Sequence, residues 1–126
     1  MRRGRSTGTP TKEESARIVA AKEGPCMACL VGVEIGLIAT EHMVVGCDYN
    51  HFKSGNIRRG HKDGCALCLW HHHGSQQLHA LGMGRREARE RWGPSMFDEG
   101  KTFRATFGSD DDLIDRQTRY LAGITG

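Results

Sequence analysis

The sequence predicts a small α+β domain in which a short β-core carries a central helix and is flanked by further helices. Its 126 residues suffice for one domain and little more. Apolar residues alternate with small or polar ones in the middle of the chain, which favours strands there. Helix start signals stand on either side of this middle part, at Thr11 and Ser109. We therefore expect a flexible basic tail over residues 1–10 and a single domain over residues 11–126.

The first helix is predicted from its two ends. Thr11 is a good N-cap residue, and Glu14, three residues later, completes a capping box. Gly24 directly follows Glu23 and is a typical helix stop. The helix should therefore run from about residue 12 to about Glu23.

Strands and a central helix are predicted for residues 30–81. Residues 30–40 alternate apolar side chains with glycine or glutamate, which indicates a strand or a hairpin arm. Residues 43–52 have the pattern of a second strand that ends in polar residues, and residues 57–67 return towards it. Residues 68–81 are the best candidate for the central helix, although Gly74 weakens its middle. Together, residues 25–80 should form the centre of the domain.

A helical extension is predicted over residues 85–122. Arg85–Trp92 is expected to be a helix or an exposed loop, since glycines break the chain on both sides. Residues 99–107 form a short helix that Gly108 closes. Ser109 caps a last helix from Asp110 to about residue 121, whose acidic first turn suits the helix dipole.

Composition and cysteine usage predict a bound metal rather than disulfides. Only 6% of the residues are aromatic, so the core is small and needs further support. No apolar run is present at the N-terminus, so we expect neither a signal peptide nor a membrane span. We therefore expect the chain in a reducing compartment, the cytoplasm, where close cysteine pairs act as metal ligands.

Two cysteine pairs predict a structural zinc site. Cys26 and Cys29, and likewise Cys65 and Cys68, are separated by two residues. This spacing lets both thiolates of a pair reach one tetrahedral ion. His71 follows Cys68 by three residues, so the two would share one face of a helix. From the spacing alone, the fourth ligand is either Cys65 or His71.

The charge distribution favours a nucleic-acid partner. The formal net charge is only +3, but basic residues cluster at the N-terminus, in the middle of the chain and around residues 85–91. Contacts to phosphates require clusters of this kind, although a charge run on a helix is often only a solvated face. The middle cluster contains the candidate DNA-binding residues Lys53, Arg58, Arg59 and Lys62.

A histidine at a strand end and a histidine run on a helix predict a hydrolytic site. His51 lies near the end of the second predicted strand, and His71, His72 and His73 lie shortly after Cys68. Consecutive helical residues point about 100° apart, so one histidine can face the zinc ion and the next a second site. A divalent ion at that site would neutralise a phosphate, and His51 would take a proton from the attacking water.

These motifs resemble those of the HNH, or ββα-metal, nucleases. The more specific resemblance is to the phage-encoded Ref-type recombination-enhancement nucleases, which depend on RecA. It rests on Asp48-Tyr49-Asn50-His51, on the loop from Lys53 through Arg58-Arg59-Gly60-His61, and on Leu67-Cys68-Leu69-Trp70-His71-His72-His73-Gly74. Gly93-Pro94-Ser95-Met96 and the stretch from Phe103 to Gly108 resemble the same family's tail. The resemblance covers residues 24–121.

The resemblance implies a role for each site residue and a treble-clef-like core with flanking helices. His51 would be the general base, and Asn50 and His72 would hold a catalytic Mg²⁺ or Mn²⁺ ion. His61 would orient the site or touch a phosphate. Asn50 stands where such enzymes often place aspartate or histidine, which are stronger ligands. The structural Zn²⁺ would be held by Cys26, Cys29, Cys68 and His71, with Cys65 as the alternative fourth ligand.

The expected function is metal-dependent endonucleolytic hydrolysis of DNA in recombination, on DNA bound by a RecA-type filament or displaced from a duplex. The resemblance implies a phage or prophage origin and the cytoplasm of a bacterial host cell. The alternative is a non-catalytic, zinc-stabilised module that binds nucleic acid, because zinc ligands and basic clusters would serve either function. A third hypothesis is metal storage or transport by the histidine run. Loss of DNA nicking in a His51→Ala variant would separate the nuclease from the binding module.

Overall fold

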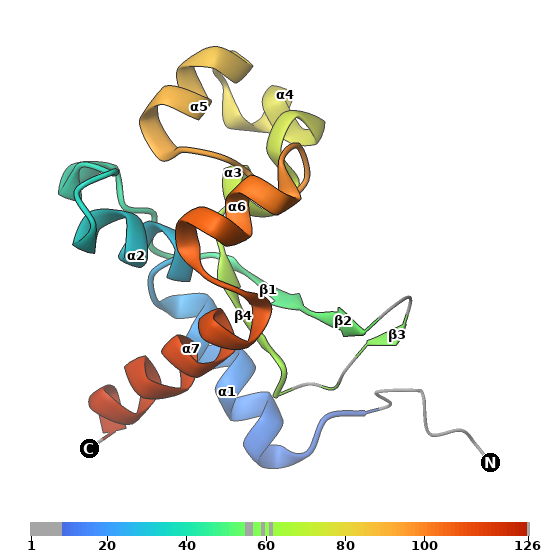
Figure 1. Cartoon of the computed structure of the whole chain (residues 1–126). Helices are drawn as coiled ribbons and strands as arrows, with labels where there is room; N and C mark the ends of the chain where they lie inside the picture. The colour runs from blue at the N-terminus through green and yellow to red at the C-terminus, as the bar shows by residue number, and fades with distance from the viewer. Residues whose placement is uncertain (1–8, 55–56, 59, 61, 126) are drawn as a thin grey trace.

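The computed structural model describes residues 9–54, 57–58, 60 and 62–125, so most of the predicted tail lies outside the described residues. The elements follow the chain in the order α1 (Lys12–Glu23), α2 (Met27–Glu34), β1 (Asp48–His51), β2 (Lys53–Ser54), β3 (Ile57–Arg58), β4 (Gly64–Leu67), α3 (Leu69–His73), α4 (Leu78–Leu81), α5 (Arg85–Trp92), α6 (Gly100–Phe107) and α7 (Asp110–Thr125). In Figure 1, β1 and β4 lie at the centre, with α1 and α7 below them and α3 to α6 above them. The predicted α+β class is confirmed.

Helix α1 begins with the predicted capping box. The Thr11 N–H donates to Glu14 Oε1 at 2.8 Å, and the Glu14 N–H donates to Thr11 Oγ1 at 3.1 Å. One turn further along, Arg17 Nε donates to Tyr49 Oη and Arg17 Nη2 donates to the Gly64 carbonyl, each at 2.9 Å. Arg17 therefore ties α1 to both strands of the central sheet.

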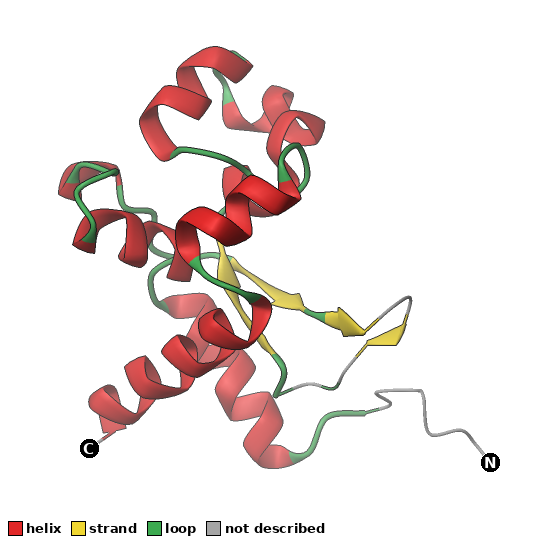
Figure 2. Ribbon diagram, in the orientation of Figure 1, coloured by secondary structure: helices red, strands yellow, loops and turns green. Residues whose placement is uncertain are grey.

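Strands β1 and β4 form an antiparallel pair that positions His51. Asn50 lies opposite Cys65, and His51 lies opposite Gly64. Strand β4 is buried along its whole length, because α1, α2 and α7 all pack against it. A side chain at Gly64 would collide with the Asn50 carbonyl, so glycine lets the two strands approach closely beside His51. Figure 2 shows that β2 and β3 extend away from this pair as a second, small antiparallel ribbon.

The strand predicted for residues 30–40 is wrong, because helix α2 occupies its first half. Five of its eight residues are buried, so the helix has no broad polar face and shows no helical period in the sequence. After the helix, the Leu37 and Ile38 N–H groups both donate to the Gly32 carbonyl, at 2.8 and 3.0 Å. A side chain at Gly32 would collide with Ile38, and Gly36 has a φ of +80°, so the two glycines of the alternation have reasons other than a pleated strand. The second predicted strand, residues 43–52, is shorter than expected, since regular pairing of β1 covers only Asp48–His51.

The single central helix predicted for residues 68–81 is also broken, and Gly74 is the reason. Gly74 ends α3 at φ +54°, a conformation that L-residues rarely adopt. A side chain there would collide with the Asp98 carboxylate and the Ser95 hydroxyl. Asp98 uses that space to accept hydrogen bonds from the Ser75 N–H at 2.8 Å and from Ser95 Oγ at 3.0 Å. A 3₁₀ turn, Gly74–Gln77, then leads into α4.

The C-terminal helices follow the prediction closely. Arg85–Trp92 is a helix rather than a loop, and α6 ends at Gly108 as expected. Ser109 caps α7, because its hydroxyl accepts a hydrogen bond from the Asp112 N–H at 3.1 Å. Helix α7 continues to Thr125, a few residues beyond the predicted end. Within the described part of the chain, no helix has the length and apolar character that crossing a membrane requires.

One hydrophobic core joins these elements. It includes Met27 from α2, Leu67 from β4, Trp70 from α3, Phe103 from α6 and Leu113 from α7, all with side chains at most 1% exposed. Four of the five cysteines are buried in the same region. Helices α2, α3, α6 and α7 and strand β4 meet in this core, and the buried cysteines and His71 lie within it.

Candidate metal centre and active site

Three cysteines and one histidine converge in the core from two helix starts. Cys26 is the N-cap of α2, and Cys29 follows in its first turn. Cys68 is the N-cap of α3, and His71 follows at the same spacing. The two segments therefore have the same local geometry, and they face each other. The ligand atoms of all four residues are buried and lie within 4.8 Å of one another.

The distances fit a tetrahedral zinc ion. Bond lengths of about 2.3 Å to sulfur and about 2.05 Å to nitrogen, at a tetrahedral angle, separate sulfur and nitrogen by about 3.6 Å. His71 Nδ1 lies 3.4 Å from Cys26 Sγ, 3.6 Å from Cys29 Sγ and 3.3 Å from Cys68 Sγ. Three thiols and one imidazole are also a donor set that suits zinc. This cluster could hold one structural zinc ion.

The other ring nitrogen of His71 is fixed from the opposite side. His71 Nε2 lies 2.8 Å from the Trp92 carbonyl oxygen, to which it donates a hydrogen bond. Because this bond occupies Nε2, Nδ1, which faces the three sulfur atoms, is the nitrogen that would bind a metal ion. The ring also contacts Phe107 edge-on, with the ring centroids 4.9 Å apart. The start of α3, the end of α5 and helix α6 thus all support the orientation of this ligand.

The electrostatics of the cluster favour a bound cation. Burial opposes a charge on His71, but the Cys68 thiolate and the hydrogen bonds with Cys29 and Cys68 outweigh it and raise the His71 pKa to about 10. Hydrogen bonds with Cys26 and Cys29 lower the pKa of Cys68 well below that of an ordinary thiol. Burial raises the pKa of Cys26, and its neighbours Cys29 and Cys68 raise it further. The low pKa of Cys68 therefore favours a thiolate at this position, and a thiolate would bind a positive ion.

Cys65 does not belong to this cluster. It lies on β4 opposite Asn50, and its side chain is buried in the core. Burial raises the pKa of its thiol, which is the behaviour of a structural cysteine. Of the two alternatives for the fourth ligand, the structure brings His71 rather than Cys65 to the other three.

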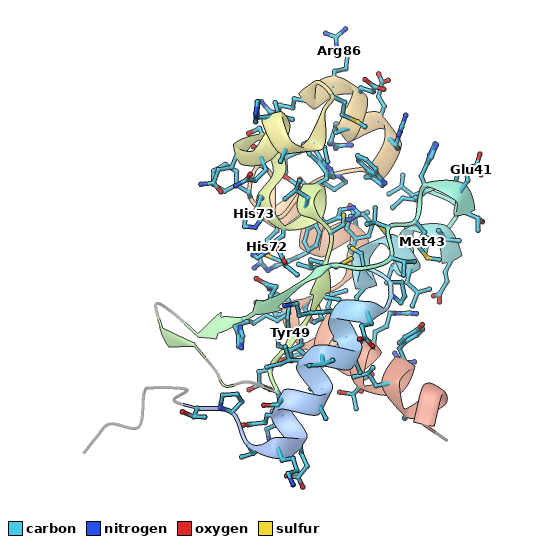
Figure 3. All side chains as sticks on the ribbon, turned by 180° about the vertical axis from the view of Figure 1, so that it is seen from behind. Glu41, Met43, Tyr49, His72, His73 and Arg86 are labelled. Carbon is cyan, nitrogen blue, oxygen red and sulfur yellow. The ribbon has the colours of Figure 1, made fainter. Side chains whose placement is uncertain are left out.

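A pocket of about 340 Å³ lies next to the metal centre. His51 reaches it from the end of β1, and His72 reaches it from α3, one residue after the candidate metal ligand His71. Figure 3 shows His72 and His73 beside each other, with His72 nearer the β-strands; their rings stack with centroids 4.0 Å apart. The described residues that line the pocket are Asn50, His51, Phe52, His72, Met96, Arg104 and Asp110.

Two buried polar atoms beside the pocket lack a hydrogen-bond partner among the described residues. They are Asn50 Nδ2 and His72 Nδ1. An unsatisfied buried polar group costs about 1–3 kcal/mol, so such atoms usually serve water or an ion. The amide of Asn50 can also present its oxygen instead of its nitrogen, because the two are interchanged by a half-turn. Burial lowers the pKa of His72, and the neighbouring His73 lowers it further, so the ring is neutral at pH 7.

Two charged residues of the pocket were not among the site residues expected from the sequence. Arg104 comes from α6 and Asp110 from the first turn of α7. Arg104 Nε donates to Asp110 Oδ1 at 2.9 Å. Arg104 lies in the stretch that resembles the family's tail, but that resemblance gave it no role. The acidic start of α7, which contains Asp110, is explained by the helix dipole alone. Only the packing of the C-terminal extension brings them to His51 and His72.

Three of the expected DNA-binding residues, Lys53, Arg58 and Lys62, belong to the described part of the chain in and after the β2–β3 ribbon. Lys53 belongs to β2 and Arg58 to β3. Lys62 is exposed in the turn before β4. Arg59 and the candidate catalytic residue His61 lie outside the described residues. The ribbon begins at Lys53, two residues after the pocket residue His51.

Comparison with known proteins identifies the family. The family model for recombination enhancement, RecA-dependent nuclease, matches residues 10–122. No curated protein and no solved structure matches the chain. The match covers the metal centre, the pocket and the C-terminal helices. The chain therefore belongs to the family of recombination-enhancement, RecA-dependent nucleases.

Proposed function

We propose that this protein is a metal-dependent DNA endonuclease of the HNH type and that its active site is the pocket between β1 and α3. The observation that carries the proposal is that His51, His72 and Asn50 line one pocket beside the Cys26–Cys29–Cys68–His71 cluster. Two antiparallel strands followed by a helix, β1, β4 and α3, supply these residues. This is the element order that the name ββα-metal describes.

In the proposed mechanism, His51 is the general base. Its ring accepts a proton from a water molecule, and the resulting hydroxide attacks the phosphorus atom of the DNA backbone. The bond from phosphorus to the leaving oxygen then breaks, that oxygen takes a proton from a solvent water molecule, and His51 returns its proton to solvent. Asn50 and His72 are the residues that would hold Mg²⁺ or Mn²⁺. Such an ion, when bound, supplies positive charge to the scissile phosphate and the leaving oxygen.

Substrate DNA would reach the pocket along the β2–β3 ribbon. We assign Lys53, Arg58, Arg59 and Lys62 to contacts with backbone phosphates, because these basic residues follow His51 closely in the sequence. His61 follows in the same loop and would orient the site or touch a phosphate. The family description names RecA, which supports DNA bound in a RecA-type filament, or a strand displaced by it, as the substrate. The setting would be a bacterial host cell, with the chain encoded by a phage or prophage.

Nicking of a supercoiled plasmid and of a RecA-made displacement loop, with Mg²⁺ or Mn²⁺, tests this function. His51→Ala should lower the rate by about 10²- to 10⁴-fold, the range for loss of a general base. His79→Ala is the matched control, because His79 is exposed on α4 and does not line the pocket. Zinc content and circular dichroism of both variants should equal those of the unmodified protein. Equal nicking by the two variants would contradict the proposal and favour a non-catalytic binding module.

A further inference from the structure

Helix α6 holds Arg104 at a fixed place beside the metal centre. Phe103 and Phe107, four residues apart, are 0% and 4% exposed, and both pack against the His71 ring. Arg104 directly follows Phe103, so its backbone position is set by the same packing. His72 lines the pocket and is the residue after the candidate ligand His71. In the same way, Arg104 lines the pocket and is the residue after Phe103.

Arg104 and Asp110 give the pocket its permanent charges. Among the described lining residues, Arg104 is the only side chain that is always cationic, and Asp110 is the only carboxylate. Arg104 Nε donates to Asp110 Oδ1 at 2.9 Å, and Nη1 donates to the Gly100 carbonyl at 3.2 Å. The two side chains are 42% and 24% exposed, so water screens the ion pair. A stronger anionic partner can therefore replace Asp110 at little cost.

We propose that Arg104 binds a backbone phosphate of DNA in this pocket and that Asp110 is its partner in the free protein. A guanidinium group can donate two parallel hydrogen bonds to one phosphate, which makes arginine well suited to hold it. The phosphate would take over the edge of the guanidinium that now faces Asp110. Asp110 would at the same time repel the incoming phosphate, so it would lower DNA affinity. This proposal rests on the proposed function only in taking the pocket as the place where DNA lies.

DNA binding of the full chain, measured by fluorescence anisotropy with a short duplex and no added Mg²⁺ or Mn²⁺, tests the proposal without cleavage. Loss of one phosphate contact should reduce the slope of log K against log salt by about 0.9, which weakens binding about 8-fold near 0.1 M salt. We expect this change in Arg104→Gln. Arg104→Lys should keep the salt slope and lose only part of the affinity, because lysine keeps the charge but not the paired hydrogen bonds.

Two further variants make the assignment specific. Arg119→Gln is the matched control, since Arg119 donates to Asp115 in a similar pair on α7 at 2.8 Å but does not line the pocket. Its salt slope should equal that of the unmodified protein. Asp110→Asn should bind DNA up to about 5-fold more tightly, because the competing carboxylate charge is gone. Equal losses in Arg104→Gln and Arg119→Gln would overturn the proposal, as would weaker binding by Asp110→Asn.

The outcomes also separate this proposal from the proposed function. If the unmodified protein nicks DNA but Arg104→Gln has an unchanged salt slope, the protein is a nuclease in which Arg104 does not contact a phosphate. A protein that never nicks DNA, with the reduced slope in Arg104→Gln alone, would be a binding module in which the Arg104 contact is correct.

Discussion

Replacement of Cys29 by serine, with Cys47→Ser as the matched control, tests whether a metal ion holds the core together. Cys29 is fully buried in the Cys26–Cys29–Cys68–His71 cluster, whereas Cys47 is partly exposed and lies outside it. Globular proteins have about 0.05–0.15 kcal/mol of stability per residue, or about 6–19 kcal/mol for a chain of 126 residues. Zinc binding to a structural site contributes about 10–16 kcal/mol. The ion should therefore account for most of the stability.

The elements that meet at the cluster explain why the loss should be global. Cys26 caps α2 and Cys68 caps α3, and the His71 ring supports α6 through Phe103 and Phe107. Without the ion, three helices would lose their common anchor, and the buried thiolates that would bind it would repel one another. We expect Cys29→Ser to lose both its zinc and its cooperative thermal transition. Cys47→Ser should keep one zinc ion per chain and melt within a few degrees of the unmodified protein.

Elemental analysis of the purified proteins gives the zinc stoichiometry, and circular dichroism gives the thermal transition. Addition of a strong chelator to the unmodified protein should reproduce the behaviour of Cys29→Ser, and restored zinc should reverse it. A metal-free protein with an unchanged transition would refute the reasoning. Loss of zinc in Cys47→Ser to the same degree as in Cys29→Ser would also refute it, because Cys47 would then be a ligand.

Two further substitutions probe the break after α3 and the pocket. Gly74→Ala should destabilise the protein by about 2–4 kcal/mol in chemical denaturation, because alanine is strained at φ +54° and its side chain collides with Asp98 and Ser95. Gly82→Ala, at φ +76° with open space around it, should lose only about 1–2 kcal/mol, and equal losses would contradict the collision. Asn50→Asp should lower the Mn²⁺ concentration for half-maximal nicking by about tenfold, because a carboxylate is a stronger ligand than an amide. An unchanged or higher Mn²⁺ requirement would show that Asn50 does not hold the ion.

Helix ends were the most predictable part of the fold. Each predicted helix end depends on hydrogen bonds between residues three or four positions apart. These ends are the capping box of Thr11 and Glu14, the stop at Gly108 and the cap at Ser109. Such bonds are decided locally, so the sequence carries the whole signal. The Cys26–Cys29 ligand pair was predictable for the same reason, since it lies at the start of one helix. At the start of α3 the spacing left Cys65 and His71 as alternative partners of Cys68, and only the packing brings His71 to the cluster.

Helix α2 shows why other parts could not be predicted. A helix reveals itself in sequence by alternating buried and exposed faces with a period of 3.6 residues. Helix α2 has most of its surface buried by β4, α6 and α7, so apolar and small residues occupy nearly all its positions. Its helical state is therefore determined by tertiary packing rather than by a periodic pattern in its own sequence. Its start at the Cys26 cap was visible only as a metal-ligand spacing.

The pocket residues also divide into those that the sequence predicts and those that only the packing reveals. His51 and His72 belong to motifs in which several unusual residues stand together, and such motifs indicate a site from the amino-acid sequence alone. Arg104 and Asp110 come from two helices in which no pattern assigns them a role. They reach the pocket because α6 packs on His71 of α3 and α7 packs on β4. A long-range contact of this kind leaves no local pattern.

The metal centre and the pocket are built from neighbouring residues, which couples stability to chemistry. His71 faces the sulfur atoms and His72 faces the pocket, while Phe103 packs on His71 and Arg104 lines the pocket. In so short a chain, the rigid element that fixes a side chain of the proposed active site is also the element that stabilises the core. Any change that loosens the Cys26–Cys29–Cys68–His71 cluster should therefore displace His72 and Arg104 together. A variant at one of these four residues that still folds should consequently lose the proposed nicking activity without losing any pocket residue.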